Sequence, residues 1–240
     1  MAYGNVYTPL GKKPYVMPRQ MTQQEISGTV RDYARATQLA HQAGFDGVEI
    51  HAAYGYLIDQ FIRDGSNLRV DKYGGSVRNR LRFLLEVTDA VSRVWSAGRV
   101  GVRLSPMSDI NSMSDSDPGR TFVEATKELS RFGLAYLHVV ENVGHDQSRP
   151  TRMRIAPHMR AVFKGSIILN GGYDAATGAA ALESGESDLI AFGRPFLANP
   201  DLVERFRQGA PLNTPDPATF YTAGPAGYTD YPAINSSSSG

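Results

Sequence analysis

The alternation of helix and strand patterns constrains the fold of this chain most. Five short apolar runs are typical of buried strands, and each follows a stretch with apolar residues at helical spacing. The runs cover residues 47–51, 100–104, 136–140, 166–170 and 189–192, and the helical stretches cover 22–40, 79–95, 121–132, 153–163 and 174–184. A capping box of Thr22 and Glu25 predicts where the first helix begins. The pattern predicts parallel βα units of the TIM (β/α)8-barrel type, an α/β fold.

The number of units falls short of a closed barrel. A complete (β/α)8 barrel typically takes about 250 residues, and this chain has 240. Only about five units can be assigned, because residues 1–21, a loop at 51–77 and a tail rich in Pro, Gly and Tyr occupy much of the length. We therefore expect residues 1–240 to form one incomplete barrel domain, with an irregular lead-in at 1–21 and a flexible tail at 235–240.

The charge and composition exclude several classes of partner. The 25 basic and 24 acidic residues nearly cancel and form no long run of one sign, so neither nucleic acid nor an anionic membrane is an expected partner. The absence of cysteine excludes disulfides and thiolate chemistry. No apolar stretch approaches a membrane span, and the N-terminus lacks a leader pattern, so we expect a cytoplasmic protein with a small-molecule partner.

Polar residues follow the predicted strands where barrel enzymes carry their chemistry. His51 and Tyr56 come at and just past the end of the first strand, and Arg103 lies within the second. Glycines at 171–172 and 193 follow the fourth and fifth strands, where loop amides of barrels commonly bind phosphate. Taken singly, such a histidine is often structural, a tyrosine usually packs, and a glycine pair is usually a turn. Their order along one chain is more specific.

The segment GFDGVEIHAAYGYLIDQF (44–61) closely resembles the Old Yellow Enzyme family, which includes plant oxophytodienoate reductases and bacterial nitroester reductases. The resemblance continues in the same order over nearly the whole chain. It is carried by residues 61–67, Arg69, DKYGGS (71–76), Asn79, Arg80, GVRLSP (101–106), NGGY (170–173), FGRP (192–195), NPDL (199–202) and GYTDYP (227–232). It places the chain in the later part of the family's sequence, without the segment expected to hold the first three barrel strands.

The resemblance implies an FMN-dependent ene-reductase driven by NAD(P)H, acting on alkenes activated by a carbonyl or nitro group. It implies that His51 binds the substrate carbonyl oxygen and that Tyr56 donates the proton to the α carbon. Arg103 would stabilise the reduced flavin. The residues implied to bind FMN are Arg103, Asn170, Gly171, Gly172, Gly193 and Arg194.

Tyr54 departs from the family pattern. The family normally has Asn or His there as a second partner of the substrate carbonyl, whereas a tyrosine hydroxyl sits farther from the backbone and fills more of the pocket. We therefore expect Tyr54 to line the substrate site with an altered scope. Tyr221 resembles a pocket-lining aromatic residue. A metal site is not expected, because His41, His138, His145 and His158 share no ligand spacing.

Alternatives to a self-sufficient ene-reductase follow from the missing units. The chain could be a truncated or degenerate, non-catalytic member that binds flavin weakly or serves as a scaffold. It could also self-associate, or be completed by a missing N-terminal segment. A Schiff-base aldolase barrel is disfavoured, because no lysine ends a predicted strand in a suitable context.

Overall fold

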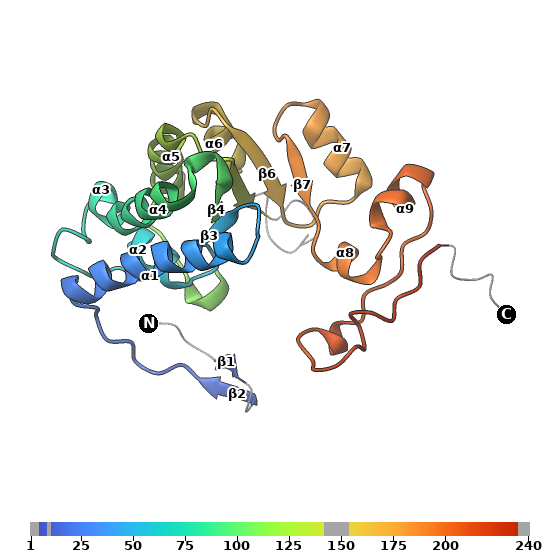
Figure 1. The fold of residues 1–240 in the computed structure, drawn as a ribbon, viewed down its shortest axis with the longest axis horizontal. Helices are drawn as coiled ribbons and strands as arrows, with labels where there is room; N and C mark the ends of the chain where they lie inside the picture. The colour runs from blue at the N-terminus through green and yellow to red at the C-terminus, as the bar shows by residue number, and fades with distance from the viewer. Residues whose placement is uncertain (1–4, 9–10, 142–153, 235–240) are drawn as a thin grey trace.

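A computed structural model describes residues 5–8, 11–141 and 154–234 (Figure 1). Within these ranges five strands form a parallel sheet in the order of the sequence. They are β3 (Val48–Ala52), β4 (Val100–Leu104), β5 (Tyr136–Val140), β6 (Ser166–Asn170) and β7 (Leu189–Ala191). The helices before them are α1 (Gln23–Gln42), α3 (Val77–Arg80) with α4 (Arg82–Trp95), α5 (Pro118–Leu129), α6 (Ala156–Val162) and α7 (Ala175–Glu183). The predicted βα alternation is confirmed.

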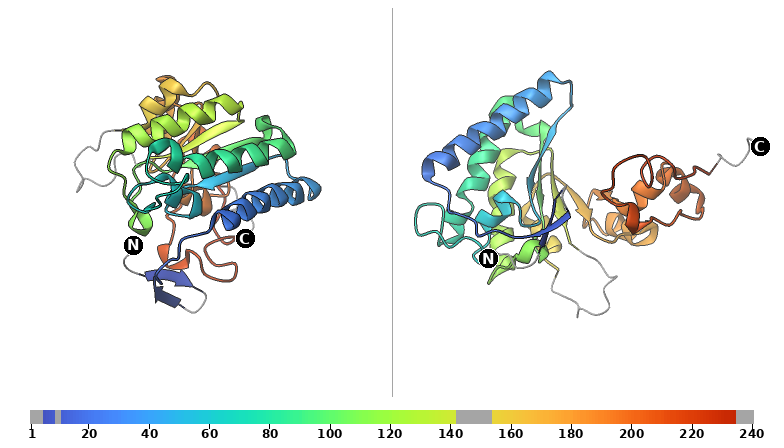
Figure 2. Two further views of the ribbon diagram at one scale, coloured as in Figure 1. Left: turned by 90° about the vertical axis from the view of Figure 1, so that its left-hand side faces the viewer. Right: turned by 90° about the horizontal axis from the view of Figure 1, so that it is seen from below.

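The two faces of the sheet differ in polarity. Alternate residues of each strand point to opposite faces, and one set is apolar and buried: Ile50, Ala52, Val100, Val102, Leu104, Leu137, Val139, Ile167 and Leu169. The apolar sides of α4 and α5, such as Phe83 and Phe122, belong to the same core. Figure 2 shows α1, α4 and α5 side by side against this face. The other face carries the polar side chains.

The lead-in is not irregular throughout, which corrects the expectation for residues 1–21. Asn5–Thr8 (β1) and Gly11–Pro14 (β2) pair as an antiparallel hairpin. Gly11 has φ +85°, a conformation that glycine adopts without strain and that suits a tight return of the chain. Hairpin pairing therefore overrides the local signal of Pro14.

Three short helices lie where the sequence suggested loop or tail. The loop at 51–77 contains α2 (Leu57–Ile62), and the C-terminal region contains α8 (Arg194–Ala198) and α9 (Leu202–Gln208). Each has seven residues or fewer, too few for a helical period to stand out. Figure 1 shows α8, α9 and the chain after them extending beyond β7. The expected flexible tail at 235–240 lies outside the described residues.

Buried polar side chains hold the C-terminal segment together. Arg205 donates to the carbonyls of Pro211 and Pro232, at 2.5 and 2.8 Å, and pairs with Asp201 at 2.7 Å. The fully buried Asn199 accepts from the Asn213 amide at 2.7 Å. The tail is therefore folded back onto α8 and α9. Among the described residues, no helix is both long and apolar enough to cross a bilayer.

Candidate active site

Strand register brings the predicted site residues together. Parallel pairing sets His51 of β3 opposite Arg103 of β4, and Arg103 opposite His138 of β5. Val140 pairs in turn with Asn170 of β6. Because these positions share one face of the sheet, the polar side chains gather near the carboxyl ends of the strands. Barrel enzymes carry their active sites at that end.

Arg103 lies at the centre of this cluster. One Nη donates to Oδ1 of Asn170 at 3.0 Å, and the guanidinium carbon lies 5.2 Å from the centroid of the Tyr54 ring. Its Nε is buried and makes no hydrogen bond within the described part of the chain. Asn170 also donates to the Ala191 carbonyl of β7 at 2.7 Å. Asn170 therefore bonds both Arg103 and β7, and its predicted contact with FMN stays a prediction.

His51 lies beside two tyrosines in a partly desolvated position. Its ring centroid is 5.3 Å from that of Tyr56 and 6.2 Å from that of Tyr54. Burial lowers the pKa of His51, and the positive charge of Arg103 lowers it further. Both effects favour the neutral imidazole, which has one N–H to donate.

The turn Tyr54–Gly55–Tyr56 has an unusual backbone. Tyr54 has φ +56° and Gly55 φ +77°, and a positive φ is uncommon for a residue with a side chain. The Tyr54 amide donates to Oγ of Ser105 at 2.8 Å, and its carbonyl accepts from Asn111 at 2.7 Å. Burial raises the pKa of Tyr54. These bonds compensate for the strain and fix the Tyr54 ring over Arg103.

Gly55 offers a direct test of how closely this turn is packed. A Cβ at Gly55 would lie 2.7 Å from Cγ of Met113 and 2.8 Å from Cβ of Asn111. Gly75 has the same φ of +77° but nothing within 4 Å of its added Cβ. We expect Gly75→Ala to lose about 1–2 kcal/mol through the backbone alone, and Gly55→Ala to lose about 1–3 kcal/mol more through overpacking. Urea unfolding measures both; equal losses would contradict the close packing.

The two tyrosines predicted for proton delivery and pocket lining are accessible. Tyr56 is 59% exposed and precedes α2, and Tyr221 is 99% exposed in the C-terminal tail. The accessibility of Tyr56 and its place beside His51 suit a group that meets a substrate. The role of Tyr221 stays a prediction.

The glycines predicted to approach phosphate follow β6 and β7. Gly171 and Gly172 have φ of +124° and +82°, which an ordinary side chain would disfavour. Gly193 precedes α8, and a Cβ there would meet nothing within 4 Å; the neighbouring Arg194 is exposed. Both loops lie at the carboxyl edge of the sheet, the same edge as His51 and Arg103.

A second polar group on this face was missed from the sequence. Nδ1 of His138 lies 2.9 Å from Oε2 of Glu49. Burial opposes ionisation of Glu49, but the His138 contact holds its pKa below the usual value. Burial and the Glu49 charge raise the pKa of Tyr136 to about 12. The Tyr136 ring lies directly over Gly101. A Cβ added at position 101 would lie 2.2 Å from the ring, so a larger residue would clash with it. Because side chains alternate between the two faces of a strand, Glu49 and His138 could have been predicted to lie on the same face as His51 and Arg103.

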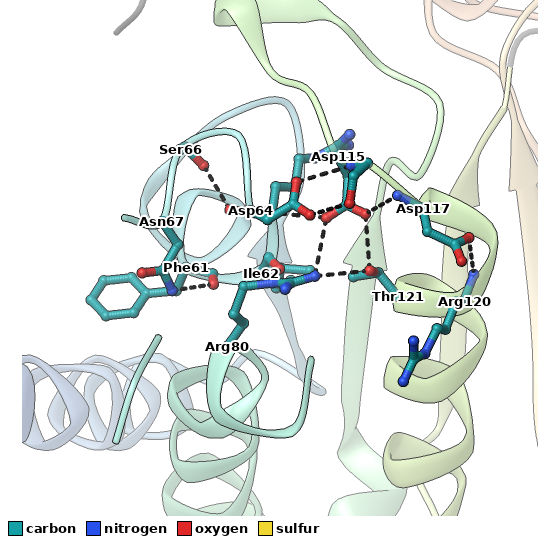
Figure 3. Close-up of polar contacts among 12 residues, drawn as sticks. Phe61, Ile62, Asp64, Ser66, Asn67, Arg80, Asp115, Asp117, Arg120 and Thr121 are labelled. Atoms are coloured by element: carbon teal, nitrogen blue, oxygen red, sulfur yellow. Dashed lines mark hydrogen bonds and ion pairs between the residues drawn. The ribbon is translucent and has the colours of Figure 1, made fainter. Parts of the chain in front are cut away.

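Figure 3 shows a network that joins the segment after α2 to the start of α5. The Asp64 amide donates to Asp115 at 3.2 Å, and the Ser116 amide donates to Asp64 at 2.9 Å. Arg80 pairs with Asp115 at 3.4 Å and donates to Thr121 at 3.1 Å. The network stabilises the scaffold beside the site without touching Tyr54–Gly55–Tyr56.

Within the ranges that the structure describes, no three His, Asp or Glu side chains are grouped to hold a metal. Nδ1 of His138 is engaged by Glu49, and His41 stacks on Trp95 with ring centroids 4.7 Å apart. His145 lies outside the described residues. His51 and His138 flank Arg103, whereas His41 and His158 lie in α1 and α6. The polar cluster around Arg103 is the candidate site.

Comparison with known proteins gives the chain a family. The sequence profile of the NADH:flavin oxidoreductase / NADH oxidase family matches residues 4–213. Putative 12-oxophytodienoate reductase 12 of Oryza sativa subsp. japonica is 49% identical, over 91% of this chain and 56% of the relative. 12-Oxophytodienoate reductase 2 of Arabidopsis thaliana is 45% identical, over 92% and 60%. The chain therefore spans somewhat more than half the length of these relatives.

Solved structures agree in fold. The old yellow enzyme homologue from Zymomonas mobilis superposes with a TM-score of 0.93 at 46% identity, covering 96% of this chain and 65% of the other. Morphinone reductase in complex with tetrahydroNAD gives a TM-score of 0.88 at 45% identity, with 98% and 64% covered. The predicted barrel-type fold and the family resemblance are both confirmed. The chain belongs to the NADH:flavin oxidoreductase / NADH oxidase family, and its described residues form five parallel strands of a partial barrel.

Proposed function

We propose that the chain carries the catalytic part of an FMN-dependent ene-reductase that takes electrons from NAD(P)H and reduces activated C=C bonds. The observation that supports this most is the convergence of His51, Tyr54, Tyr56 and Arg103 at the ends of β3 and β4. Relatives include a probable flavin mononucleotide-dependent alkene reductase of Leishmania infantum. Morphinone reductase, solved with tetrahydroNAD, supports a nicotinamide donor.

The residues present fit FMN. The buried Nε of Arg103 has no partner in the described chain, so a donor is free for an acceptor on the isoalloxazine. Gly171, Gly172 and Gly193 let backbone amides approach a phosphate, and the exposed Arg194 can add a charge-assisted contact. Asn170 would support the group through Arg103. When bound, FMN supplies hydride to the carbon β to the activating group.

The side chains of this chain would polarise the substrate and supply the proton. Neutral His51 can donate a hydrogen bond to a carbonyl or nitro oxygen, where negative charge grows during reduction. The accessible hydroxyl of Tyr56 can donate a proton to the α carbon. The Tyr54 ring, seated over Arg103, narrows the site beside His51 and would favour small or flat alkenes.

A non-catalytic role is the second candidate, and the sheet itself favours it. Among the described residues, β3 pairs only with β4 and β7 only with β6, so neither outer edge is closed. An absorbance spectrum and NAD(P)H oxidation with 2-cyclohexenone separate the two roles when they are measured on the chain joined to an upstream segment that supplies three further βα units. Bound yellow flavin with turnover supports the ene-reductase. Flavin without turnover, or no flavin, supports the non-catalytic role.

Arg103→Ala should weaken FMN binding by about 10- to 100-fold. This corresponds to losing a hydrogen bond of a charged group, about 1.5–3 kcal/mol. Titration of FMN fluorescence measures the dissociation constant. Arg99→Ala is the matched control, because Arg99 is exposed before β4, at the opposite end of the strand. An unchanged dissociation constant in the Arg103 variant would refute the assignment.

A further inference from the structure

A buried ion pair lies behind the turn that presents the tyrosines. Asp59 and Arg63, one helical turn apart in and after α2, have side chains 0% and 2% exposed, with Oδ1 and Nε 2.9 Å apart. Burial raises the pKa of Asp59 despite the adjacent guanidinium. A buried pair is weak evidence for stability, because desolvation offsets most of its attraction. The hydrogen bonds of this ion pair indicate a positioning role instead.

The carboxylate holds the turn from behind. The second oxygen of Asp59, Oδ2, accepts from the Gly55 amide at 2.8 Å in a buried position. Gln60 donates to the Gly55 carbonyl at 2.7 Å. Within this turn, Tyr54 and Gly55 are the residues with left-handed backbone. Asp59 thus fixes the peptide at which the chain reverses between His51 and Tyr56.

The guanidinium connects the same turn to β4. Arg63 donates to the carbonyls of Ser105 and of Pro106, and its Cζ lies 4.9 Å from the Phe122 ring centroid. Ser105 follows Arg103 by two residues, and its hydroxyl accepts from the Tyr54 amide at 2.8 Å. A closed path therefore runs from Gly55 through Asp59, Arg63 and Ser105 back to Tyr54.

We infer that Asp59 and Arg63 are positioning residues, which lock the Tyr54–Gly55–Tyr56 turn against the end of β4 and so fix Tyr56 relative to Arg103. The catalytic consequence rests on the proposed function. The hydrogen bonds of Asp59 and Arg63 that hold the turn do not depend on that function. A small displacement of the proton donor slows the reaction strongly, because proton transfer requires the donor to lie within hydrogen-bond distance of the accepting atom.

Amide hydrogen exchange followed by mass spectrometry tests whether Asp59 and Arg63 hold the turn. The full chain is used, in whatever assembly it forms. Asp59→Asn keeps an acceptor for the Gly55 amide but removes the charge, and Asp59→Ala removes both. We expect exchange at the Tyr54 and Gly55 amides to accelerate about tenfold in Asp59→Asn and further in Asp59→Ala. The matched control is Asp115→Asn, which breaks the buried ion pair of Asp115 with Arg80 (Figure 3). It should accelerate exchange near Asp64 and Ser116 only.

Half-reaction rates give a readout that a merely stabilising pair would not change. Asp59→Asn should slow enone reduction about tenfold, with little change in the KM for NADPH, and Asp115→Asn should change neither. Equal acceleration of turn exchange by both variants, or none by Asp59→Asn, would overturn the inference. Absence of turnover in the unmodified chain even after it is joined to an upstream segment with three further βα units would count against the proposed function alone, and the exchange measurement would still decide the positioning role.

Discussion

Replacing Tyr56 by phenylalanine should slow reoxidation of the reduced protein by an enone by about 10²–10⁴-fold, the usual contribution of a positioned general acid. Reduction by NADPH should stay nearly unchanged, because it requires no phenolic proton. Tyr56 is 59% exposed, so removing its hydroxyl breaks little packing. The variant therefore separates chemistry from stability better than a change at a buried residue.

Stopped-flow absorbance of the flavin follows the two half-reactions separately. Tyr228→Phe is the matched control, because Tyr228 is also exposed, at 41%, and lies in the C-terminal tail. It should slow neither half-reaction. If Tyr56→Phe slowed both half-reactions equally, Tyr56 would be a packing residue and the proton would come from another group.

Helices and strands with strong local sequence patterns could be predicted from the sequence alone. The capping box at Thr22 and Glu25 forms both of its hydrogen bonds, at 2.8 and 3.2 Å, so the start of α1 was predicted correctly. The strands at 100–104, 136–140 and 166–170 have the predicted bounds, because short apolar runs between helices have few other solutions. The helix expected over 79–95 is instead divided at Leu81 into α3 and α4.

The site could be predicted only where position along a strand decides it. His51 and Arg103 meet because equivalent positions of adjacent parallel strands share a face. The pair Glu49–His138 joins residues 89 positions apart, so strand alternation could place both on one face but could not predict their contact. Asp59 and Arg63 have the i,i+4 spacing of a helical ion pair, but the sequence could not show that the pair is buried behind the turn. The left-handed backbone of Tyr54 is equally hidden, since tertiary hydrogen bonds compensate for it.

The unpaired outer strands of the parallel sheet should destabilise the chain when it is produced by itself. In the described residues, β3 and β7 are the outer strands and do not pair with each other, so each has backbone groups available to another strand. The face that a closed barrel would enclose carries the polar groups Glu49, His51 and Arg103; Glu49 is exposed here, and His51 and Arg103 are only partly buried. Domain stability is about 5–15 kcal/mol, a margin that missing core surface readily exceeds.

We therefore predict that the 240-residue chain, produced by itself, oligomerises or aggregates, holds FMN below stoichiometry and shows little ene-reductase activity. Supplying an upstream segment with three further βα units, taken from a family member and fused to residue 1, should restore all three properties, because it would pair with the free edges and complete the flavin site. An unrelated βα segment of equal length is the control and should restore none. Light scattering, the ratio of flavin to protein absorbance, and turnover with an enone measure the outcome. A monodisperse, cooperatively melting monomer with stoichiometric FMN and full turnover would show that five strands suffice, and that the polar face of the sheet is stable without a closing wall.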